Sequence, residues 1–457
     1  MDNPDIQKLL ASLDRPDADP ARAASGEVFA ADIAASLPHM DEPTQLLIFQ
    51  LLDDIKAAEV LAHADENVQA IVLGSLDQER LTRLFIEMEP DDAADLLAVA
   101  PDEARDGMLA ELDDDARRSV AMLGEYEPES AGGIMTTDVV TVSSNSATDA
   151  ALAKIGDDEN SESMDSVFVV DNSGALVGVA DVKSLLKAES PQTVGDVMSA
   201  DVISIRADED QEEAARLVDR YDITALPVVD DAGRLKGVIT VDDIIDVLEE
   251  EASEDMLRLA GTGVTHPTSE PVLRRLRARA PWLAVTLAGT FVAALLIEYV
   301  ERTWFEVGEG GDANFRALLY FIPLIGGMAG NVGSQSSTIM VRGFATGEVD
   351  PTRPMRVLRG ELLLALLIGA LSALLVGCGV ALAHADSAWL GWAVGLALPC
   401  AIFVAALVGT LVPFACHRVG VDPAYAGGPF LLTLNDIAAF LIYFAVAIQL
   451  MKFLGIS

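Results

Sequence analysis

The segment GPFLLTLNDIAAFLIYF, residues 428–444, places one carboxylate, Asp436, within an otherwise uncharged apolar run. A second apolar segment, PLIGGMAGNVGSQSST at residues 323–338, carries four glycines at helical spacing together with Asn331 and Gln335. A carboxylate inside a membrane is costly and normally faces water, a cation or a partner group. The two segments therefore predict membrane helices that border a polar pathway.

Both segments also have a structural explanation. Small residues permit close helix contact, so the glycines could serve packing alone. Asp436 could be a structural node that is hydrogen-bonded to Asn435 or Thr433. The polar residues favour the functional interpretation, which gives four candidate pore-lining residues: Gly330, Asn331, Gln335 and Asp436. Asp422, in the loop VGVDPAYAGG, fits either a turn before Pro423 or an acid at the inner mouth of a pore.

Uncharged runs of about 20 residues span a bilayer as helices, and the C-terminal part of the chain contains five. The predicted spans are residues 281–297, 317–341, 362–383, 387–416 and 428–451. The fourth has 30 residues, so it must tilt, kink or extend past the bilayer. Glu298 and Glu361 lie at span ends, where we expect their side chains to reach the interface.

The chain divides sharply in charge near residue 280. Over its 457 residues the net charge is −42, yet the mean hydropathy is +0.34. Residues 1–279 hold 61 acids and 22 bases, a net −39, whereas residues 280–457 hold 11 acids and 8 bases, a net −3. An acidic soluble half therefore precedes a membrane half. Phosphate binding needs clustered bases, so the charge excludes nucleic acid as the default partner and favours cations.

Residue types typical of catalysis do not cluster in the sequence. The three cysteines lie in apolar stretches, and the five histidines are scattered, so no CxxC, zinc or HExxH pattern exists. The nucleotide-hydrolysis pattern G-x-x-x-x-G-K-[ST] is also absent. We therefore expect no enzyme, and any ion flux should follow the electrochemical gradient.

Basic residues predict the orientation of the spans, because positively charged loops remain cytoplasmic. Arginines at 274–279 precede the first span, others at 342–359 surround the loop between the second and third, and His417 and Arg418 follow the fourth. All three groups fall on one side. Since the N-terminal residues contain no apolar run and hence no signal peptide, we expect a cell-membrane protein with a cytosolic acidic half and an external C-terminus.

Residues 52–123 repeat a helical pattern every 12 residues. The restarts are Leu52, Ala64, Leu76, Met88, Ala100 and Leu112. An acid or a proline after each restart opens a short helix, and an apolar pair closes its buried face. Such repeats stack into a superhelix. First-turn acids suit the helix dipole, but Asp91, Asp92 and Asp95 are denser than this requires. The first 25 residues, rich in Asp, Pro and Ala, predict a disordered tail.

A longer repeat follows. GGIMTTDVVTV from residue 132 matches GDVMSADVISI from 195, and FVVDNSGALVGVADV from 168 matches PVVDDAGRLKGVITV from 227. Each copy predicts strand, helix, strand, glycine turn, strand and helix. This pattern resembles the CBS domain, which pairs through its sheets and often binds adenine nucleotides. Thr240 and Asp243 resemble the family's T-x-x-D, which implies one site for ATP or a related nucleotide. Alternatively, Thr240 caps a helix that has Asp243 in its first turn.

The segment VDDIIDVLEEEASEDMLRLAG, residues 241–261, predicts an acidic connecting helix. Its acids are Asp242, Asp243, Asp246, Glu249, Glu250, Glu251, Glu254 and Asp255. Like charges at i, i+4 destabilise a helix, and bound cations would remove this cost. A solvated acidic face is the alternative. Part of the acidity could also reflect a salt-rich cytosol, because only seven lysines accompany 23 arginines.

The order of these parts resembles the MgtE magnesium channels over nearly the whole chain. The resemblance implies a multidomain membrane protein with a cytosolic α-helical superhelix, tandem α/β CBS modules, a connecting (plug) helix and a five-helix transmembrane domain. The expected boundaries are residues 1–25 for the disordered tail, 26–127 for the acidic helical repeat domain and 128–190 for the first CBS module. The second CBS module is expected at 191–248, the connecting helix at 249–279 and the transmembrane domain at 280–457. It further implies a homodimer in membrane lipid, with the pore between subunits and hydrated Mg²⁺ held at Asp436.

The resemblance also implies a magnesium sensor that closes the pore when cytosolic Mg²⁺ is high. The implied Mg²⁺-binding acids outside the pore are Asp91, Asp95, Glu212, Asp222, Asp243, Asp246, Glu251, Glu254 and Asp255, with Asp422 as a further candidate at the pore mouth. Two alternatives remain open. One is a CBS-regulated carrier for another substrate, such as divalent cobalt or an anion, although Asp436 argues against anions. The other is a membrane-anchored nucleotide or salt sensor without transport.

Overall fold

The computed structural model describes residues 29–112, 114–157, 166–189, 191–262, 272–305, 313–350 and 353–456. The chain forms two compact units, Met1–Glu250 and Glu251–Ser457. The predicted disordered tail, residues 1–25, lies outside the described residues.

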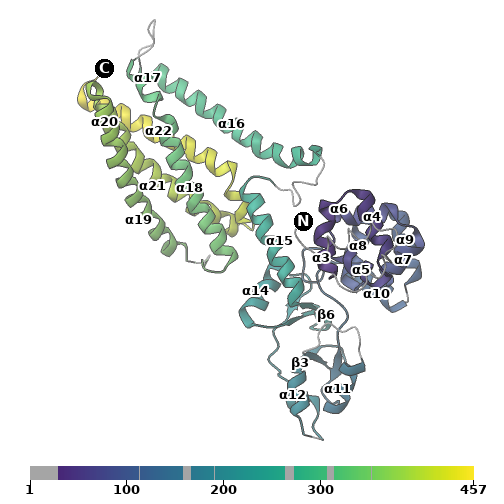
Figure 1. Cartoon of the computed structure of the whole chain (residues 1–457). Coiled ribbons are helices and arrows are strands. Elements are labelled where there is room, and N and C mark those ends of the chain that lie inside the picture. Colours follow the sequence, from purple (N-terminus) through teal and green to yellow (C-terminus); the bar gives the residue numbers. More distant parts are fainter. Residues whose placement is uncertain are drawn as a thin grey trace. The chain divides into compact units, whose positions relative to one another are not determined.

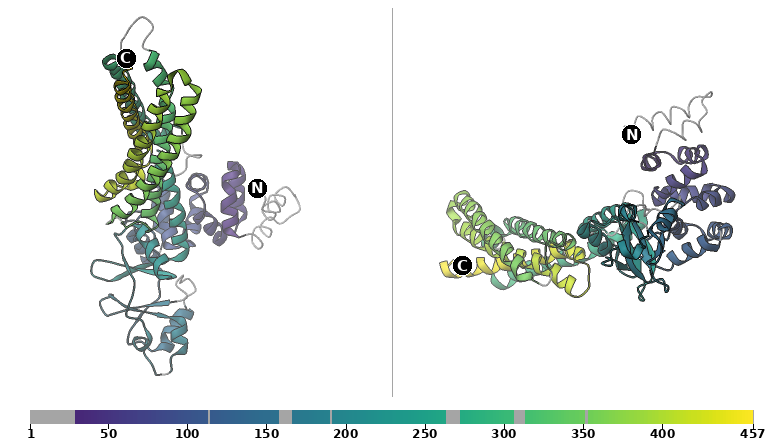
Figure 2. Two further views of the ribbon diagram at one scale, coloured as in Figure 1. Left: turned by 90° about the vertical axis from the view of Figure 1, so that its left-hand side faces the viewer. Right: turned by 90° about the horizontal axis from the view of Figure 1, so that it is seen from below.

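The first unit opens with a stack of short helices (purple to blue in Figures 1 and 2). They are α3 (Ala30–Ser36), α4 (Glu42–Leu51), α5 (Asp54–Ala62), α6 (Glu66–Ser75), α7 (Gln78–Ile86), α8 (Pro90–Val99), α9 (Asp102–Glu111) and α10 (Asp114–Leu123), with the 3-10 turn Leu37–His39 after α3. Helices α4 to α10 begin every 12 residues, so the predicted repeat is confirmed. Each helix packs on the next but one, as α5 on α3 and α7 on α5, which produces the superhelix.

The repeat has a local hydrogen-bonding cause. Aspartates one residue before α5, α6 and α7 accept backbone N–H bonds of 2.9 Å, which satisfies donors that a helix start leaves unpaired. At a second repeat position, a Gln or Arg side chain donates to the carbonyl eight residues earlier. These pairs are Gln45 to Leu37, Gln69 to Leu61, Arg105 to Leu97 and Arg117 to Leu109. The Asp caps the start of its own helix, and the Gln or Arg of the following helix binds a carbonyl near the end of the helix before it.

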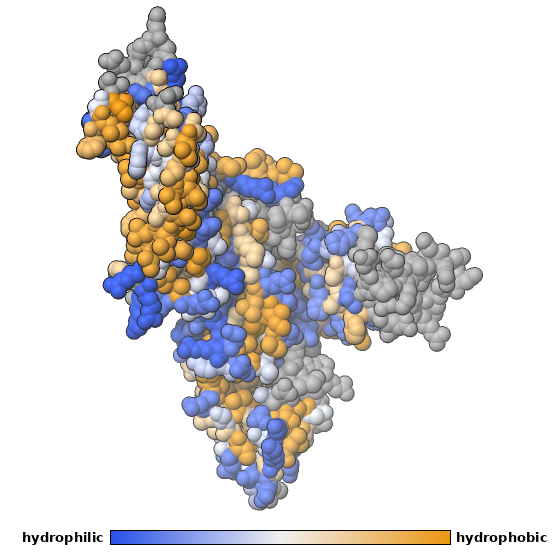
Figure 3. Space-filling view, turned by 60° about the vertical axis from the view of Figure 1, so that its left-hand side comes forward, coloured by the Kyte–Doolittle hydropathy of each residue, from blue (hydrophilic) through white to orange (hydrophobic). Residues whose placement is uncertain are grey.

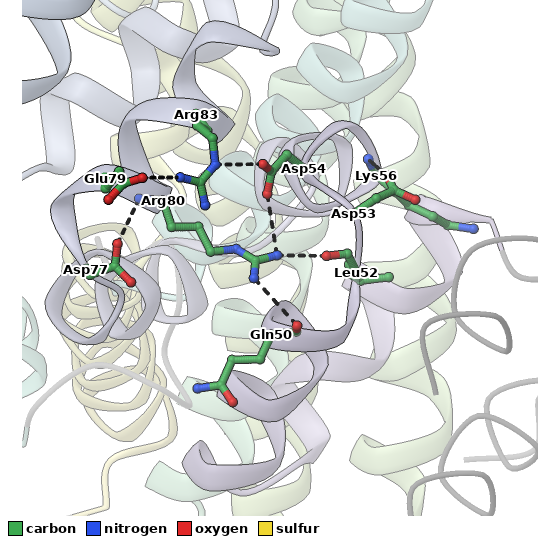
Figure 4. Close-up of polar contacts among 9 residues, drawn as sticks. All are labelled: Gln50, Leu52, Asp53, Asp54, Lys56, Asp77, Glu79, Arg80 and Arg83. Carbon is green, nitrogen blue, oxygen red and sulfur yellow. Dashed lines mark hydrogen bonds and ion pairs between the residues drawn. The ribbon is translucent and has the colours of Figure 1, made fainter. Parts of the chain in front are cut away.

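Arginines also tie neighbouring repeats together (Figure 4). Arg80 donates to the Leu52 carbonyl at 2.7 Å, at the end of α4. Arg83, one turn further along α7, donates to Asp54 at 2.8 Å and to Glu79 at 3.2 Å. These bonds hold α7 against the start of α5 and the end of α4.

Two similar three-stranded sheets follow, as the internal repeat predicts. The first module contains β1 (Thr141–Ser143), α11 (Thr148–Asp157), β2 (Ser166–Val170), β3 (Leu176–Asp181) and α12 (Val182–Lys187); the second contains α13 (Val194–Val197), β4 (Ile205–Arg206), α14 (Gln211–Tyr221), β5 (Ala225–Val229), β6 (Leu235–Thr240) and α15 (Val241–Leu259). In each sheet the first two strands are parallel and the last two antiparallel.

The two modules pair with each other through equivalent residues. Leu176 donates its N–H to Gly233 and Leu235 donates to Gly174, at 3.0 and 3.1 Å. Both glycines have positive φ, 82° at Gly174 and 75° at Gly233, as the predicted turns require. The sequence repeat is thus a pseudo-twofold pair in space.

The second unit contains five helical segments long and apolar enough to cross a membrane, in the described residues. They are α16 (Val272–Trp304), α17 with α18 (Ala313–Leu319 and Ile322–Ala345), α19 with α20 (Pro354–Ser372 and Cys378–Ala383, joined by the π-helical turn Ala373–Gly377), α21 (Trp389–Arg418) and α22 (Pro429–Leu454). The short 3-10 helices Ala385–Ser387 and Pro423–Ala426 connect the last three segments. The five predicted spans are confirmed, with longer helices than predicted.

Helix α21 contacts α18, α19 and α22 and forms the centre of this bundle. This helix has 30 residues and contains Pro399 and Pro413, positions at which a long helix can kink. The outer side of the bundle is apolar, as the orange surface at the upper left of Figure 3 shows. Exposed leucines of α19 contribute to this apolar side, namely Leu363, Leu364, Leu366, Leu367 and Leu371. An apolar exterior fits a lipid environment.

Candidate ion pathway and acidic cytosolic sites

Asp436 faces the glycines of α18. It is the eighth residue of α22, about 10 Å along the helix from its start. Its Oδ1 lies 3.2 Å from the position that a Cβ on Gly326 would occupy, and 3.9 Å from that of Gly330. These two glycines are four residues apart and share one helix face. The glycine pattern therefore makes room for a carboxylate, which simple helix packing does not explain.

The structural alternative for Asp436 is not observed. Thr433 donates its hydroxyl to the Pro429 carbonyl at 2.8 Å, within its own helix. The Asn435 amide, only 1% exposed, packs against Gly333 of α18, and neither of its polar atoms has a partner in the described residues. Asp436 itself forms no hydrogen bond or ion pair within that part of the chain. Its charge is thus left for water or a cation.

The other predicted pore residues lie apart from this contact. Asn331 is exposed and follows Gly330 directly. Gln335 lines a hollow against α19. Five residues turn a helix by about 500°, so Gln335 lies roughly 140° around α18 from Gly330. The structure therefore brings Asp436 together with Gly330 but not with Gln335.

Asp422 has the turn role, one of the two that the sequence left open, and also forms an ion pair; its role at a pore mouth stays a prediction. Its Oδ1 accepts the N–H of Ala424 at 2.7 Å, which caps the turn after Pro423. Its Oδ2 accepts from Arg258 Nη1 at 2.6 Å, near the end of α15. Arg258 also pairs with Glu254 and lies 5.1 Å from the centre of the Tyr425 ring. The sequence analysis missed Arg258, although it is the only base in residues 241–259.

Acids gather around this ion pair. Burial, together with the charges of Asp422 and Glu251, raises the pKa of Asp255 to about 6, while Arg258 acts in the opposite direction. The carboxylates of the α15 end and of Asp422 therefore repel one another at neutral pH. This second unit has an acidic site, defined by Glu251, Glu254, Asp255 and Asp422, that one guanidinium compensates only partly.

A separate acidic cluster lies in the first unit, on the first turns of α8 and α15. Burial raises the pKa of Asp91 to about 8, and the charges of Asp92 and Asp243 add to this shift. Burial likewise raises the pKa of Asp92 to about 7 and that of Asp95 to about 6, with Asp243 contributing to both. Asp246 adds its charge at Asp92. The predicted residues Asp91, Asp95, Asp243 and Asp246 are therefore neighbours, and the sequence analysis left out Asp92 as a ligand.

Asp91 carries a specific sign of an unmet interaction. Its Oδ1 is buried and has no hydrogen-bond partner in the described residues. An unpaired buried carboxylate oxygen is costly, so the oxygen-rich site fits a hard divalent cation such as Mg²⁺, which keeps several waters and needs few carboxylates. In the described part of the chain, no three His, Cys, Asp or Glu side chains form a group that could hold a metal by themselves.

Two further predicted ligands lie elsewhere in the second module. Glu212, in the first turn of α14, pairs with Arg216 at 2.8 Å. Asp222 ends α14 in the left-handed conformation, with φ at 51°, and is exposed. The Arg216 ion pair of Glu212 and the helix-end conformation of Asp222 are local features of α14.

Thr240 and Asp243 meet at the start of α15. Asp243 Oδ2 accepts bonds from the Thr240 hydroxyl at 2.7 Å and from the Thr240 N–H at 3.2 Å. These bonds are one half of a capping box, in which an acid of the first turn accepts the N–H of the residue before the helix; here Asp243 and not Thr240 supplies the accepting side chain. Asp243 Oδ1 accepts no hydrogen bond from the described residues, so the carboxylate still fits a ribose hydroxyl. The two interpretations are compatible.

A carboxylate in an apolar helix beside a glycine stripe, carried on the same chain as a helical repeat and paired CBS modules, is typical of a membrane cation transporter with additional soluble domains. Family models agree with each part: a divalent cation transporter model, MgtE, matches residues 322–446, the MgtE intracellular N domain matches 28–129, and the CBS domain matches 131–190 and 194–250. The chain belongs to the MgtE family.

Similar proteins cover almost the whole chain. The magnesium transporter MgtE of Thermus thermophilus is 35% identical over 457 residues, which is 97% of this chain and 98% of that protein. The magnesium transporter MgtE of Bacillus subtilis is 33% identical over 423 residues, 91% of this chain and 90% of that protein. Both names describe transporters, in agreement with the expectation of no enzyme.

A solved structure resembles the cytosolic part. It is the crystal structure of the cytosolic domain of the Mg²⁺ channel MgtE in complex with ATP. It is 34% identical, covers 53% of this chain and 98% of that chain, and superposes with a TM-score of 0.50.

Proposed function

We propose that this chain is a Mg²⁺-selective channel or transporter of the cell membrane, which cytosolic Mg²⁺ closes. Its membership of a magnesium transporter family supports the cargo. The observation that carries the proposal is the Asp436 carboxylate, 3.2 Å from the Cβ position of Gly326 and without a protein counter-charge in the described residues. A hydrated cation would supply that charge, because Mg²⁺ gives up its waters reluctantly.

The pathway would form between two copies of the chain. A twofold dimer places two Asp436 side chains opposite each other, which gives the ring of acids that cation channels use. Gly330, Asn331 and Gln335 remain the proposed pore-lining residues, and Asn435 joins them because its buried amide lacks a protein partner. With five spans and cytosolic acidic domains, the C-terminus lies outside.

The two acidic sites supply a physical basis for closure. Burial, with a smaller contribution from neighbouring like charges, disfavours the ionised carboxylates of Asp91, Asp92, Asp95 and Asp243, as their raised pKa values indicate. The same holds for Asp255 beside Asp422. Bound Mg²⁺ would neutralise these carboxylates and stabilise the compact form by mass action. Glu212 and Asp222 remain candidate ligands of the sensor.

We further propose that ATP or a related nucleotide binds the CBS pair through Thr240 and Asp243. The ATP complex of the similar cytosolic domain supports this, as does the position of the two side chains. Calorimetry with adenine nucleotides, with and without Mg²⁺, tests it. The division at residues 26–127, 128–190, 191–248, 249–279 and 280–457 remains our proposal for the functional parts.

Mg²⁺ flux into liposomes that contain the purified chain tests the proposed function directly. Flux should appear without added nucleotide and fall as Mg²⁺ on the cytosolic side rises. Competition with cobalt in the same assay decides between Mg²⁺ and the second candidate cargo. If the vesicles conduct no divalent cation under any condition, the result favours the alternative of a membrane-anchored nucleotide or salt sensor without transport.

A further inference from the structure

The face of α18 turned away from Asp436 borders a separate polar hollow. It is small, with a volume of about 30 Å³, and lies between α18 and α19. Its polar lining consists of Gln335, Ser336 and Glu361, and apolar side chains such as Val332, Leu364 and Ile368 surround them. Neither Asp436 nor the glycines that border it contribute to this hollow.

The Glu361 side chain is half-buried and turns toward α18. Its Oε2 accepts the hydroxyl of Ser336 at 2.7 Å, and Ser336 is 2% exposed. Glu361 is the eighth residue of α19, so it lies about 10 Å along that helix from its start. By contrast, Glu298, the other acid predicted at a span end, pairs with Arg302.

The carboxylate has no protein counter-charge. Arg356 and Arg359 precede it on α19, yet Glu361 forms no ion pair in the described residues. An acid at this depth in a membrane segment normally pairs with a positive charge. The Ser336 hydroxyl is neutral and offers only a hydrogen bond.

The number of charges selects the class of ligand. One carboxylate is neutralised by one positive charge, whereas a divalent ion would leave an uncompensated charge in an apolar surrounding, which is costly. The oxygens present, a carboxylate, a hydroxyl and an amide carbonyl, suit a hard cation. We propose that Glu361, Ser336 and Gln335 bind a monovalent metal cation, Na⁺, in the hollow between α18 and α19.

This site goes beyond the proposed function and does not depend on it. Helix α18 carries the Glu361 contact on one face and the glycines beside Asp436 on the other. An ion bound in the hollow therefore contacts α18, the helix that also borders the proposed ion pathway. Through this helix, Na⁺ could influence the ion pathway.

Binding of radioactive Na⁺ to the purified full-length chain in detergent tests the site, at constant ionic strength with choline as the replacement cation. Wild type should bind about one Na⁺ per chain in a saturable manner. Wild type that binds no Na⁺ would overturn the site.

Three variants separate a charge effect from a packing effect. Glu361→Gln keeps the shape and can still accept the Ser336 hydrogen bond, so it should fold while losing Na⁺ binding. Glu361→Asp keeps the charge and should retain weaker binding. Glu298→Gln removes an acid of another span and should bind as wild type does. Equal Na⁺ binding in wild type and Glu361→Gln would reduce the Glu361 to Ser336 bond to a packing contact. This readout does not involve Mg²⁺ flux, so failure here leaves the proposed function untouched.

Discussion

The Asp422 carboxylate accepts a 2.6 Å hydrogen bond from Arg258, which lies 164 residues earlier at the end of α15. Asp422 belongs to the turn between α21 and α22, so this bond joins the connecting helix to the membrane bundle within the second unit. Tyr425 adds to the junction, because it lies beneath the Arg258 guanidinium and stacks on Trp282 at 6.0 Å. The ion pair of Arg258 with Asp422 and the ring contacts of Tyr425 together make up this junction.

Loss of the guanidinium should loosen this junction when Mg²⁺ is absent. In Arg258→Gln, Glu254, Asp255 and Asp422 lose their shared positive partner, and a hydrogen bond between charged groups contributes about 1.5 to 3 kcal/mol. Protease cleavage near Leu257 in EDTA should accelerate by about tenfold, the factor that corresponds to about 1.4 kcal/mol. Millimolar Mg²⁺ should largely restore protection.

Arg216→Gln is the matched control, because it breaks only ion pairs within α14. Cleavage of this variant should follow wild type. If Arg258→Gln is cleaved no faster than Arg216→Gln in EDTA, the Arg258 contact does not hold α15 in place.

Acids of the connecting helix should set the Mg²⁺ sensitivity of closure. Replacement of Glu251, Glu254 and Asp255 together by Ala removes the carboxylates that face Asp422 but leaves Asp436 unchanged. Flux in liposomes should persist, and closure should shift to higher cytosolic Mg²⁺. Molar KCl should not substitute for Mg²⁺ in closing the wild type. An unshifted closure curve in the triple variant, or equal protection by KCl, would mark these acids as a salt adaptation.

Stability of the metal-free chain should increase as the pH falls. The pKa values of Asp91, Asp92 and Asp95, about 8, 7 and 6 in the folded chain, lie above the ordinary value of 3.8. The folded state therefore binds protons more tightly than the unfolded state. The resulting stabilisation is complete below pH 4 and is lost as the pH rises through 6, 7 and 8. Thermal unfolding in EDTA between pH 5.5 and 8.5 measures this trend.

The variant Asp91→Asn with Asp92→Asn should flatten that pH dependence and raise the unfolding temperature at pH 8.5. Asp219→Asn, on the exposed side of α14, serves as the control and should leave the slope unchanged. Identical slopes in all three proteins would show that the Asp91 cluster does not titrate in this range.

The glycines of α18 offer a test of the pathway geometry. In Gly326→Ala the new methyl group lies 3.2 Å from Asp436 Oδ1 and 3.0 Å from the Phe440 ring, so the carboxylate must shift and Mg²⁺ flux should fall severalfold. In Gly327→Ala, one residue along, the methyl group has no atom within 4 Å. This neighbour should retain wild-type flux. Equal flux in the two variants would remove Gly326 from the ion pathway.

Local signals explain why much of the fold could be predicted. The caps at Asp53, Asp65 and Asp77 act within three residues, so the 12-residue period in the sequence translates directly into helices. The CBS repeat predicts its own pairing, because equivalent turns at Gly174 and Gly233 meet.

Contacts between distant segments could not be predicted in the same way. In the sequence, Glu361 stands at the end of an apolar run, as an interfacial acid does. Its bond with Ser336 depends on how α18 and α19 pack together, which the sequence does not reveal. The ion pair of Arg258 with Asp422 joins residues far apart in the chain. Glu212 has an Arg four residues later, a local partner that the sequence offered and that we did not weigh against metal binding.

The most direct test of the central claim is Mg²⁺ flux through Asp436→Asn in liposomes, with Glu298→Gln as the control. Asn keeps the shape of the side chain beside Gly326 and Gly330 but removes the only charge that faces those glycines. The account predicts a flux at least about tenfold below wild type at equal protein and equal folding, with Glu298→Gln unaffected. Wild-type flux through Asp436→Asn would contradict a selective cation site at this residue.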